Sequence, residues 1–214
     1  MAEKSKNGFS YSKDKKALYG NDIITPRSRL GFARGLYEAA SSYPGAKPKY
    51  SANFLFGKED AAVKKEVDAI KEMCKLMLVD LFGARAGQVL GTFKDTRKMF
   101  RDGDAPSGNG KVYEGFAGCH VIVAKSAFPA GHYQGFKVIG KEVEEFQSGE
   151  IVRGVVQPYL NEDGFAWILR TVKFLENDGV SFGGAPDPSG LLDGLDEAVQ
   201  AVQNNESGLD LSGL

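Results

Sequence analysis

Hydrophobic residues along the chain follow two spacings, which predict strands over most of its length and one long helix. Between Tyr50 and Phe56 every second residue is apolar or aromatic, and this alternation is typical of a strand with one buried face. From Asp60 to Phe82 the apolar residues instead recur at intervals of three and four, at Val63, Val67, Ile70, Cys74, Met77 and Leu81. These positions form one face of a helix, and Gly83 is a natural stop for it.

Other stretches carry shorter strand patterns, separated by glycine, proline and polar residues. Residues 148–184 predict a hairpin whose turn is the sequence NEDG at 161–164, and residues 135–146 predict two short strands or one bent strand. Further strand regions are expected at 26–39 and 113–127, whereas 1–24 are polar and loose and 84–111 are irregular. This mainly β pattern with one helix favours a small barrel or a strongly bent sheet, and it lacks the strand and helix alternation of a Rossmann-type fold.

Strict alternation through residues 165–174 does not decide which face of that strand is buried. It places Phe165, Trp167, Leu169, Thr171 and Lys173 on one face. The other face would carry Ala166, Ile168, Arg170, Val172 and Phe174, so each face holds an aromatic ring and a cation. Trp167 therefore has two interpretations, as a core residue or as a platform on which a base stacks.

The charge of the chain is unevenly distributed. Residues 187–214 contain six acids and no Lys or Arg, and the acids are Asp187, Asp193, Asp196, Glu197, Glu206 and Asp210. The preceding residues 1–186 hold 27 Lys and Arg against 22 Asp and Glu, a net charge of +5. A mildly basic body followed by an acidic tail is a weak indication of nucleic-acid binding.

Composition narrows the class of protein further. A length of 214 residues with 42% hydrophobic residues predicts one folded domain with extensions. No apolar run is long enough to span a membrane, and the lysine-bearing N-terminus does not resemble a signal peptide, so a cytoplasmic protein is expected. Cys74 and Cys119 do not form a disulfide framework, and Cys119, His120 and His132 lack the paired spacing of a zinc motif.

Motifs of enzymatic sites are incomplete in the glycine-rich loop at 102–110. Gly103 and Gly108 have the spacing of a phosphate-binding loop, but Asn109 stands where the motif needs Lys. Asp102 and Asp104 match the start of a calcium loop, but Pro106 replaces its third oxygen ligand. We therefore expect no enzyme, no metal and no cofactor. A hydrolase that uses Asp102 and Asp104 with a metal remains the third hypothesis for function.

Basic and aromatic residues recur together in three places, and this combination is typical of single-strand binding. A cationic groove follows the phosphates, while flat rings stack on unpaired bases. The candidate nucleic-acid-binding residues are Lys47, Lys49, Tyr50, Arg97, Lys98, Arg101, Arg153, Tyr159, Trp167, Arg170 and Lys173. Tyr50, like its neighbours Phe54 and Phe56, has the alternative of filling a barrel core.

Two segments carry a resemblance to a known family. They are KPKYSANFLFGKED at 47–60 and the hairpin that begins SGEIVRG and ends VSFGG at 148–184. Together with the helix between them, they resemble a family of bacteriophage single-stranded DNA-binding proteins with an OB fold. The resemblance implies a five-stranded Greek-key barrel at 25–186, between a flexible basic segment at 1–24 and a flexible acidic tail at 187–214. It also implies sequence-independent binding of single-stranded DNA in phage replication, recombination or repair, in the cytoplasm of an infected host.

The resemblance also implies a role for the tail, in which its acids compete with DNA for the basic groove and recruit phage or host replication proteins. The tail residues concerned are Asp193, Asp196, Glu197, Glu206, Asp210 and Leu214. A disordered solubilising segment is the alternative, and residues 195–203 have the pattern of a short helix. A structural or virion barrel without nucleic-acid function is the second hypothesis for the whole chain. The sequence leaves a monomer and a dimer equally open.

Overall fold

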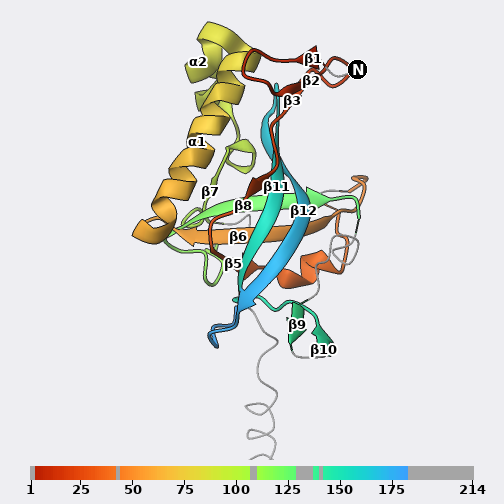
Figure 1. Cartoon of the computed structure of the whole chain (residues 1–214), viewed down its shortest axis with the longest axis vertical. Coiled ribbons are helices and arrows are strands. Elements are labelled where there is room, and N and C mark those ends of the chain that lie inside the picture. Colours follow the sequence, from red (N-terminus) through yellow and green to blue (C-terminus); the bar gives the residue numbers. More distant parts are fainter. Residues whose placement is uncertain (1–2, 42–43, 107–109, 129–136, 140–141, 183–214) are drawn as a thin grey trace, which may run out of the picture. The chain divides into compact units, whose positions relative to one another are not determined.

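A closed β-barrel forms the centre of the protein. The structure is a computed structural model that describes residues 3–41, 44–106, 110–128, 137–139 and 142–182 (Figure 1). The barrel strands are β5 (Ser28–Gly31), β6 (Tyr50–Gly57), β8 (Cys119–Ser126), β11 (Ile151–Asn161) and β12 (Gly164–Glu176). They pair in the order β11, β12, β8, β6, β5, and β5 pairs back with β11 to close the ring.

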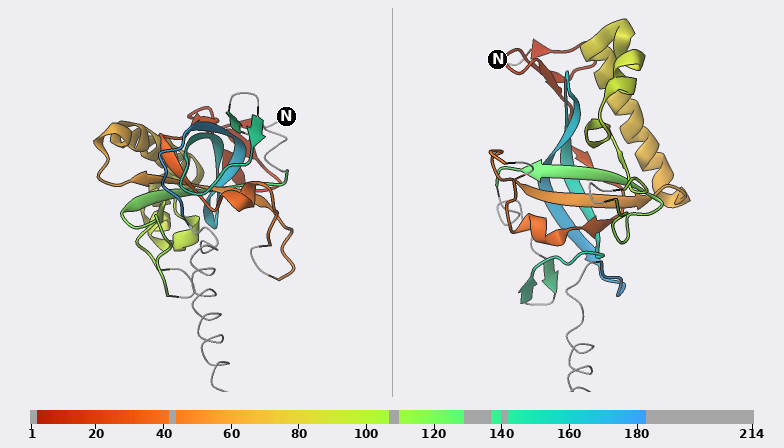
Figure 2. Two further views of the ribbon diagram at one scale, coloured as in Figure 1. Left: turned by 90° about the horizontal axis from the view of Figure 1, so that it is seen from below. Right: turned by 180° about the vertical axis from the view of Figure 1, so that it is seen from behind.

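Four of the five pairings in the ring are antiparallel, and β12 pairs with β8 in parallel. The first three barrel strands of the chain, β5, β6 and β8, are therefore neighbours in the ring in that order. The last strand, β12, lies next to β8, and β11 lies between β12 and β5. This is the connectivity of a five-stranded Greek-key OB barrel, and the predicted fold is confirmed. Figure 2 shows the strands wrapping around the core when the molecule is seen from below.

Short strands at the N-terminus extend the sheet beyond the barrel. They are β1 (Glu3–Lys4), β2 (Ser10–Ser12), β3 (Ala17–Tyr19) and β4 (Ile23–Ile24). β3 and β4 both pair with β11, and Ala17 and Leu18 are fully buried. The prediction that residues 1–24 are loose is therefore wrong for the described residues, because a few buried apolar side chains anchor strands too short to show a period.

The predicted long helix is α1 (Ala61–Phe82), which follows β6 and lies beside the barrel (Figure 1). The carboxylate of Asp60 accepts a hydrogen bond from the Ala62 amide at 2.9 Å and caps the N-terminus. Gly83 ends the helix with a φ of +57°. The face that packs on the barrel contains Val63, Val67, Ile70, Cys74, Met77 and Leu78.

The segment expected to be irregular, 84–111, contains short regular pieces. These are η2 (Gly83–Arg85), α2 (Ala86–Thr92), η3 (Asp95–Arg97) and β7 (Arg101–Asp102). A further short helix, η1 (Ala33–Leu36), follows β5, and the hairpin of β9 (Lys137–Ile139) and β10 (Glu142–Glu144) confirms the two short strands expected in 135–146.

A β-bulge interrupts the alternation of β12. Val155 of β11 is opposite Thr171, but the next residue, Val156, is opposite Leu169, so Arg170 is an extra residue. Before the bulge the odd-numbered residues of β12 face the core, and after it the even-numbered residues do. The core residues are Phe165, Trp167 and Leu169, followed by Val172 and Phe174. The predicted division into two faces is right up to Leu169 and wrong beyond it.

Two further predictions concern membrane spans and the acidic tail. No helix in the described ranges is long and apolar enough to cross a membrane. The acidic tail, with Asp193, Asp196, Glu197, Glu206, Asp210 and Leu214, lies outside the residues that the structure describes. The domain boundaries at residues 25 and 187 and the role of the tail therefore stay predictions.

Candidate nucleic-acid interface

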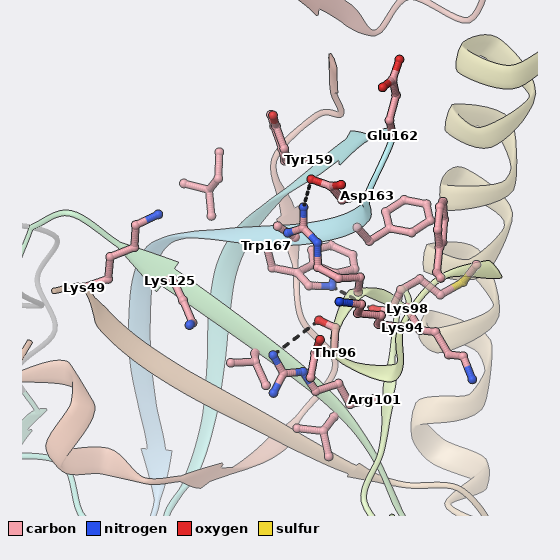
Figure 3. Close-up of a pocket in the computed structure, with 18 of the residues that line it drawn as sticks. Lys49, Lys94, Thr96, Lys98, Arg101, Lys125, Tyr159, Glu162, Asp163 and Trp167 are labelled. Carbon is pink, nitrogen blue, oxygen red and sulfur yellow. Dashed lines mark hydrogen bonds and ion pairs between the residues drawn. The ribbon is translucent and has the colours of Figure 1, made fainter. Parts of the chain in front are cut away.

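An open groove of about 1460 Å³ lies on the outer side of the barrel (Figure 3). Its floor is the outer face of β8 and β12. Its sides come from the loop before β6, the segment between α2 and β7, the turn between β11 and β12, and the N-terminal strand β3. OB barrels commonly bind oligonucleotides on the face of their second and third strands and on the loop between the fourth and fifth. The groove shares with that surface the third strand, β8, and the turn between β11 and β12.

Cations dominate the lining of this groove. Figure 3 shows Lys49 and Lys125 on one side of it and Lys94, Lys98 and Arg101 on the other. The acids that line it are Glu162 and Asp163, against eight basic side chains, which are Lys15, Lys47, Lys49, Lys94, Arg97, Lys98, Arg101 and Lys125. Such an excess of positive charge in a concave surface attracts a polyanion.

Lys125 is a half-buried cation on the floor of this groove. Alternation along β8 buries Ile122 and Ala124 completely and directs Val123 and Lys125 outward into the groove. Burial lowers the pKa of Lys125 below its usual value, and Arg101, Lys49 and Arg97 lower this pKa further. A phosphate in the groove would relieve this repulsion among like charges.

The rim that carries Lys94, Arg97, Lys98 and Arg101 is tied to the barrel. The side-chain oxygen of Asn161 accepts a hydrogen bond from Nη2 of Arg97 at 3.1 Å, and the Asp163 carboxylate lies 3.6 Å from the same nitrogen. Gly164 lies so close to this rim that an added Cβ would be 2.6 Å from the Arg97 carbonyl oxygen. The rim therefore keeps its cations beside the hairpin turn.

Two tyrosines stand at the end of the groove near the hairpin turn. Tyr19 of β3 and Tyr159 of β11 form an edge-to-face pair with ring centroids 5.0 Å apart, and both are half-buried. Nζ of Lys15 donates to the Tyr19 hydroxyl at 3.1 Å and lies 5.8 Å from the centre of its ring. Together they form a cationic and aromatic surface of the kind that holds an unpaired base.

Seven of the eleven predicted site residues line the groove, although no observation tests their role. They are Lys47, Lys49, Arg97, Lys98, Arg101, Tyr159 and Trp167. Trp167 is only 5% exposed and packs in the core, so its contribution here is to support the floor.

The other four predicted residues lie outside the groove lining. Arg153 pairs with Glu66 of α1 at 3.0 Å, and Arg170 approaches Asp22 at 3.3 Å. Lys173 is exposed beyond the bulge, and Tyr50 begins β6 with its side chain half-buried. These four residues are therefore not among those that line the groove.

Sequence analysis missed several lining residues, among them Lys15, Tyr19, Lys94 and Lys125. Lys125 could have been found, because alternation through 119–126 puts it opposite the apolar face. Lys15 and Tyr19 carry no such signal, since only the pairing of β3 with β11 brings them to the groove.

The two carboxylates that the sequence offered as metal ligands, Asp102 and Asp104, both pair with Lys58. Nζ of Lys58 lies 2.5 Å from the Asp102 carboxylate and 2.6 Å from that of Asp104. The pKa values of both carboxyl groups are lowered, mainly by their hydrogen bonds to Lys58. Among the described residues no group of three or more His, Cys, Asp or Glu side chains could hold a metal ion. Lys58 thus connects both carboxylates of this loop to the end of β6.

Comparison with known proteins identifies the family. The model of the family described as "Enterobacter phage Enc34, ssDNA-binding protein" matches residues 21–197. The chain belongs to this phage ssDNA-binding protein family. No curated protein matches it.

Two solved structures resemble the chain. The first is the single-stranded DNA-binding protein from bacteriophage Enc34 in complex with ssDNA. It has a TM-score of 0.53 and 20% identity, over 86% of this chain and 98% of that one. This likeness shows a shared fold. The second is gp2.5, a single-stranded DNA-binding protein encoded by bacteriophage T7, with a TM-score of 0.35 and 11% identity over 76% of this chain and 98% of that one.

Proposed function

We propose that the protein binds single-stranded DNA without regard to base sequence and coats exposed strands during phage DNA replication, recombination or repair. The observation that carries this proposal is the groove, whose lining holds eight cations against two carboxylates on the outer face of an OB barrel. The family description and the fold shared with the Enc34 protein support the same function.

The phosphate backbone would follow the two rows of cations, Lys49 and Lys125 on one side and the rim from Lys94 to Arg101 on the other. These contacts neutralise charge and release bound counterions, so affinity would fall steeply with salt. Bases would turn toward the Tyr19 and Tyr159 rings and the apolar floor at Val123 and Ile168. Every base has a flat face that can stack on an aromatic ring, so binding of this kind would not depend on the base sequence.

The acidic tail would compete with DNA for this groove and contact replication proteins of the phage or its host. Phe182, the last described residue, packs against a cluster that contains Val121, and Val121 also lines the groove. Asp187 follows five residues later, a span of up to about 17 Å in extended chain. Tethered carboxylates at this range would have a high effective concentration at the cations.

The direct test is fluorescence anisotropy of a labelled oligothymidine with the full chain and with a chain ending at Gly184, at two salt concentrations. We expect tight single-strand binding that weakens with salt, much weaker binding of duplex, and tighter binding after truncation. A full-length variant with the six tail acids changed to Asn or Gln separates the charge of the tail from its length. Absence of binding by every chain at low salt contradicts the proposed function.

A further inference from the structure

Three aromatic rings form an exposed patch next to the groove but outside its lining. They are Phe32, which follows β5, and Tyr113 and Phe116, which lie in the loop before β8; we call them the aromatic shelf. Phe32 and Tyr113 are each 46% exposed, whereas Phe116 is 8% exposed and anchors them. Ring centroids lie 4.9 Å apart for Phe32 and Tyr113, 5.3 Å for Phe32 and Phe116, and 5.5 Å for Tyr113 and Phe116.

The shelf adjoins the floor of the groove. Val121 lines the groove and packs with Leu55 and Phe116 in one cluster. On the next strand Leu55 is opposite Val121, and on β5 Gly31 lies opposite Asn53. Phe116 covers Gly31, where an added Cβ would lie 3.0 Å from its ring. The shelf therefore meets the groove at the buried cluster of Leu55, Phe116 and Val121, on which Phe182 also packs.

The exposed ring of Phe32 is held in place at a cost to the backbone. Phe32 has a φ of +52°, in the left-handed region that favours glycine. Its ring meets the edge of Tyr113 at an interplanar angle of 89°. A bulky apolar side chain that is strained, ordered and exposed has no role in the core, and such positions concentrate where a protein binds a ligand.

We propose that the aromatic shelf is a second stacking subsite, which takes the bases of a single strand after it leaves the cationic groove on the side of Val121 and Phe116. This inference rests on the proposed function, because the strand must first occupy the groove. The shelf suits bases rather than phosphates, since it is made of rings. Because Phe116 of the shelf packs against Val121 of the groove lining, a strand that extends beyond the groove on this side would reach the rings, and we therefore take the same nucleic acid as the occupant rather than a separate protein.

The test is the dependence of affinity on oligonucleotide length, in oligothymidines from about 4 to 16 nucleotides, the range of site sizes of one OB fold. Wild-type protein should gain affinity when the strand becomes long enough to reach the shelf. The double variant Phe32→Leu, Tyr113→Leu keeps apolar side chains but removes the rings, and it should lose about tenfold or more of that gain. Its affinity for the shortest oligonucleotides that bind should be unchanged.

A matched control is Leu76→Ala on α1, because Leu76 is also apolar and 46% exposed but lies outside the groove lining. It should keep the full gain with length. The variant Phe32→Gly removes the ring and releases the strained backbone, so it should weaken binding of long strands without lowering the melting temperature. A loss of stability in place of affinity would point to a merely structural role.

A measurement on the unaltered full chain removes any dependence on how the variants fold. Oligothymidines carrying a single 5-iododeoxyuridine at successive positions should crosslink to peptides containing Phe32 or Tyr113 from one end of the strand only. If crosslinks never reach these peptides and the double variant binds long strands like wild type, the subsite is overturned while the groove stands. If no strand binds the wild-type chain at all, the proposed function itself fails.

Discussion

Nε1 of Trp167 donates a hydrogen bond to the main-chain carbonyl of Met99 at 2.8 Å. Met99 lies in the rim segment between Lys98 and Arg101, so the indole ties the basic rim to the core strand β12. The only tryptophan of the chain is thus a support for the groove, with its ring next to Phe100 at 6.5 Å between centroids.

Replacing Trp167 by Phe should lower the free energy of unfolding by about 1–3 kcal/mol, because the Met99 carbonyl loses its partner. Urea unfolding followed by circular dichroism measures this change. Affinity for single-stranded DNA should fall only modestly in the folded variant. Unchanged stability with a tenfold or larger loss of affinity would instead assign the ring to base stacking.

DNA binding should be coupled to protonation of Lys125. Its pKa is lowered by burial and by the neighbouring cations Arg101, Lys49 and Arg97, whereas a bound phosphate favours the charged form and raises this pKa. Affinity should therefore fall as pH rises through the lowered pKa, with proton uptake on binding below the usual lysine value.

Anisotropy titrations from about pH 7 up to the ordinary lysine pKa of 10.5 compare wild type with Lys125→Arg, whose guanidinium stays charged throughout. The ratio of the two affinities should shift toward the arginine variant as pH rises. A ratio that does not change with pH would show that Lys125 is fully charged in the free protein.

The pair of Arg29 and Asp178 should contribute stability that depends on pH. Hydrogen bonds from Arg29 are the main cause that lowers the pKa of Asp178 from 3.8 to about 2. A lowered carboxyl pKa stabilises the fold above the unfolded value, and this contribution is lost as pH falls from about 4 through about 2.

Thermal melts across this range should show a smaller pH dependence for Asp178→Asn than for wild type. Asp163→Asn is the control, because Asp163 is an exposed acid whose distance to Arg97 is longer, at 3.6 Å. Equal pH dependence in wild type and Asp178→Asn would rule out this pair as a source of acid sensitivity.

Gly154 should not tolerate a side chain. An added Cβ on this β11 residue would lie 2.2 Å from the ring of Phe54, which is fully buried in the barrel. Gly154→Ala should destabilise the protein by about 1–3 kcal/mol through overpacking. Gly87→Ala in α2, where nothing lies within 4 Å, should be neutral or stabilise by up to about 1 kcal/mol. Urea unfolding measures the change in the free energy of unfolding for both variants. An unchanged free energy for Gly154→Ala would contradict the close contact between Gly154 and Phe54.

Local sequence signals predicted the elements that depend on neighbouring residues. The period of the helix from Asp60 to Phe82 and the turn at Asn161–Gly164 needed no knowledge of distant contacts, and both are present. The bulge at Arg170 was not predictable, because it is fixed by register with β11. It also explains why each predicted face of β12 held an aromatic ring and a cation.

The groove could be predicted only in part, because barrel closure assembles it from distant segments. Lys47, Lys49 and the 97–101 cluster were recognised as basic clusters near aromatic residues. Their proximity to Lys15 and Tyr19 arises from strand pairing across more than a hundred residues of chain, such as Tyr19 with Tyr159, and their proximity to Lys125 from the pairing of β8 with β6 and β7. Conversely, Arg153 and Arg170 looked like binding residues by composition, but each has an acidic neighbour in the fold.

The most direct test of the groove compares two triple variants that remove the same charge. One changes Lys49, Lys94 and Lys125 to Gln inside the groove, and the other changes Arg153, Arg170 and Lys173 to Gln outside it. Affinity for oligothymidine is measured across a salt series, after circular dichroism has shown that both variants are folded. We expect the groove variant to lose affinity and its salt slope to fall by about 2, at about 0.7 per phosphate contact, with little change in the outer variant. Equal losses in both variants, or a larger loss in the outer one, would contradict the placement of single-stranded DNA in this groove.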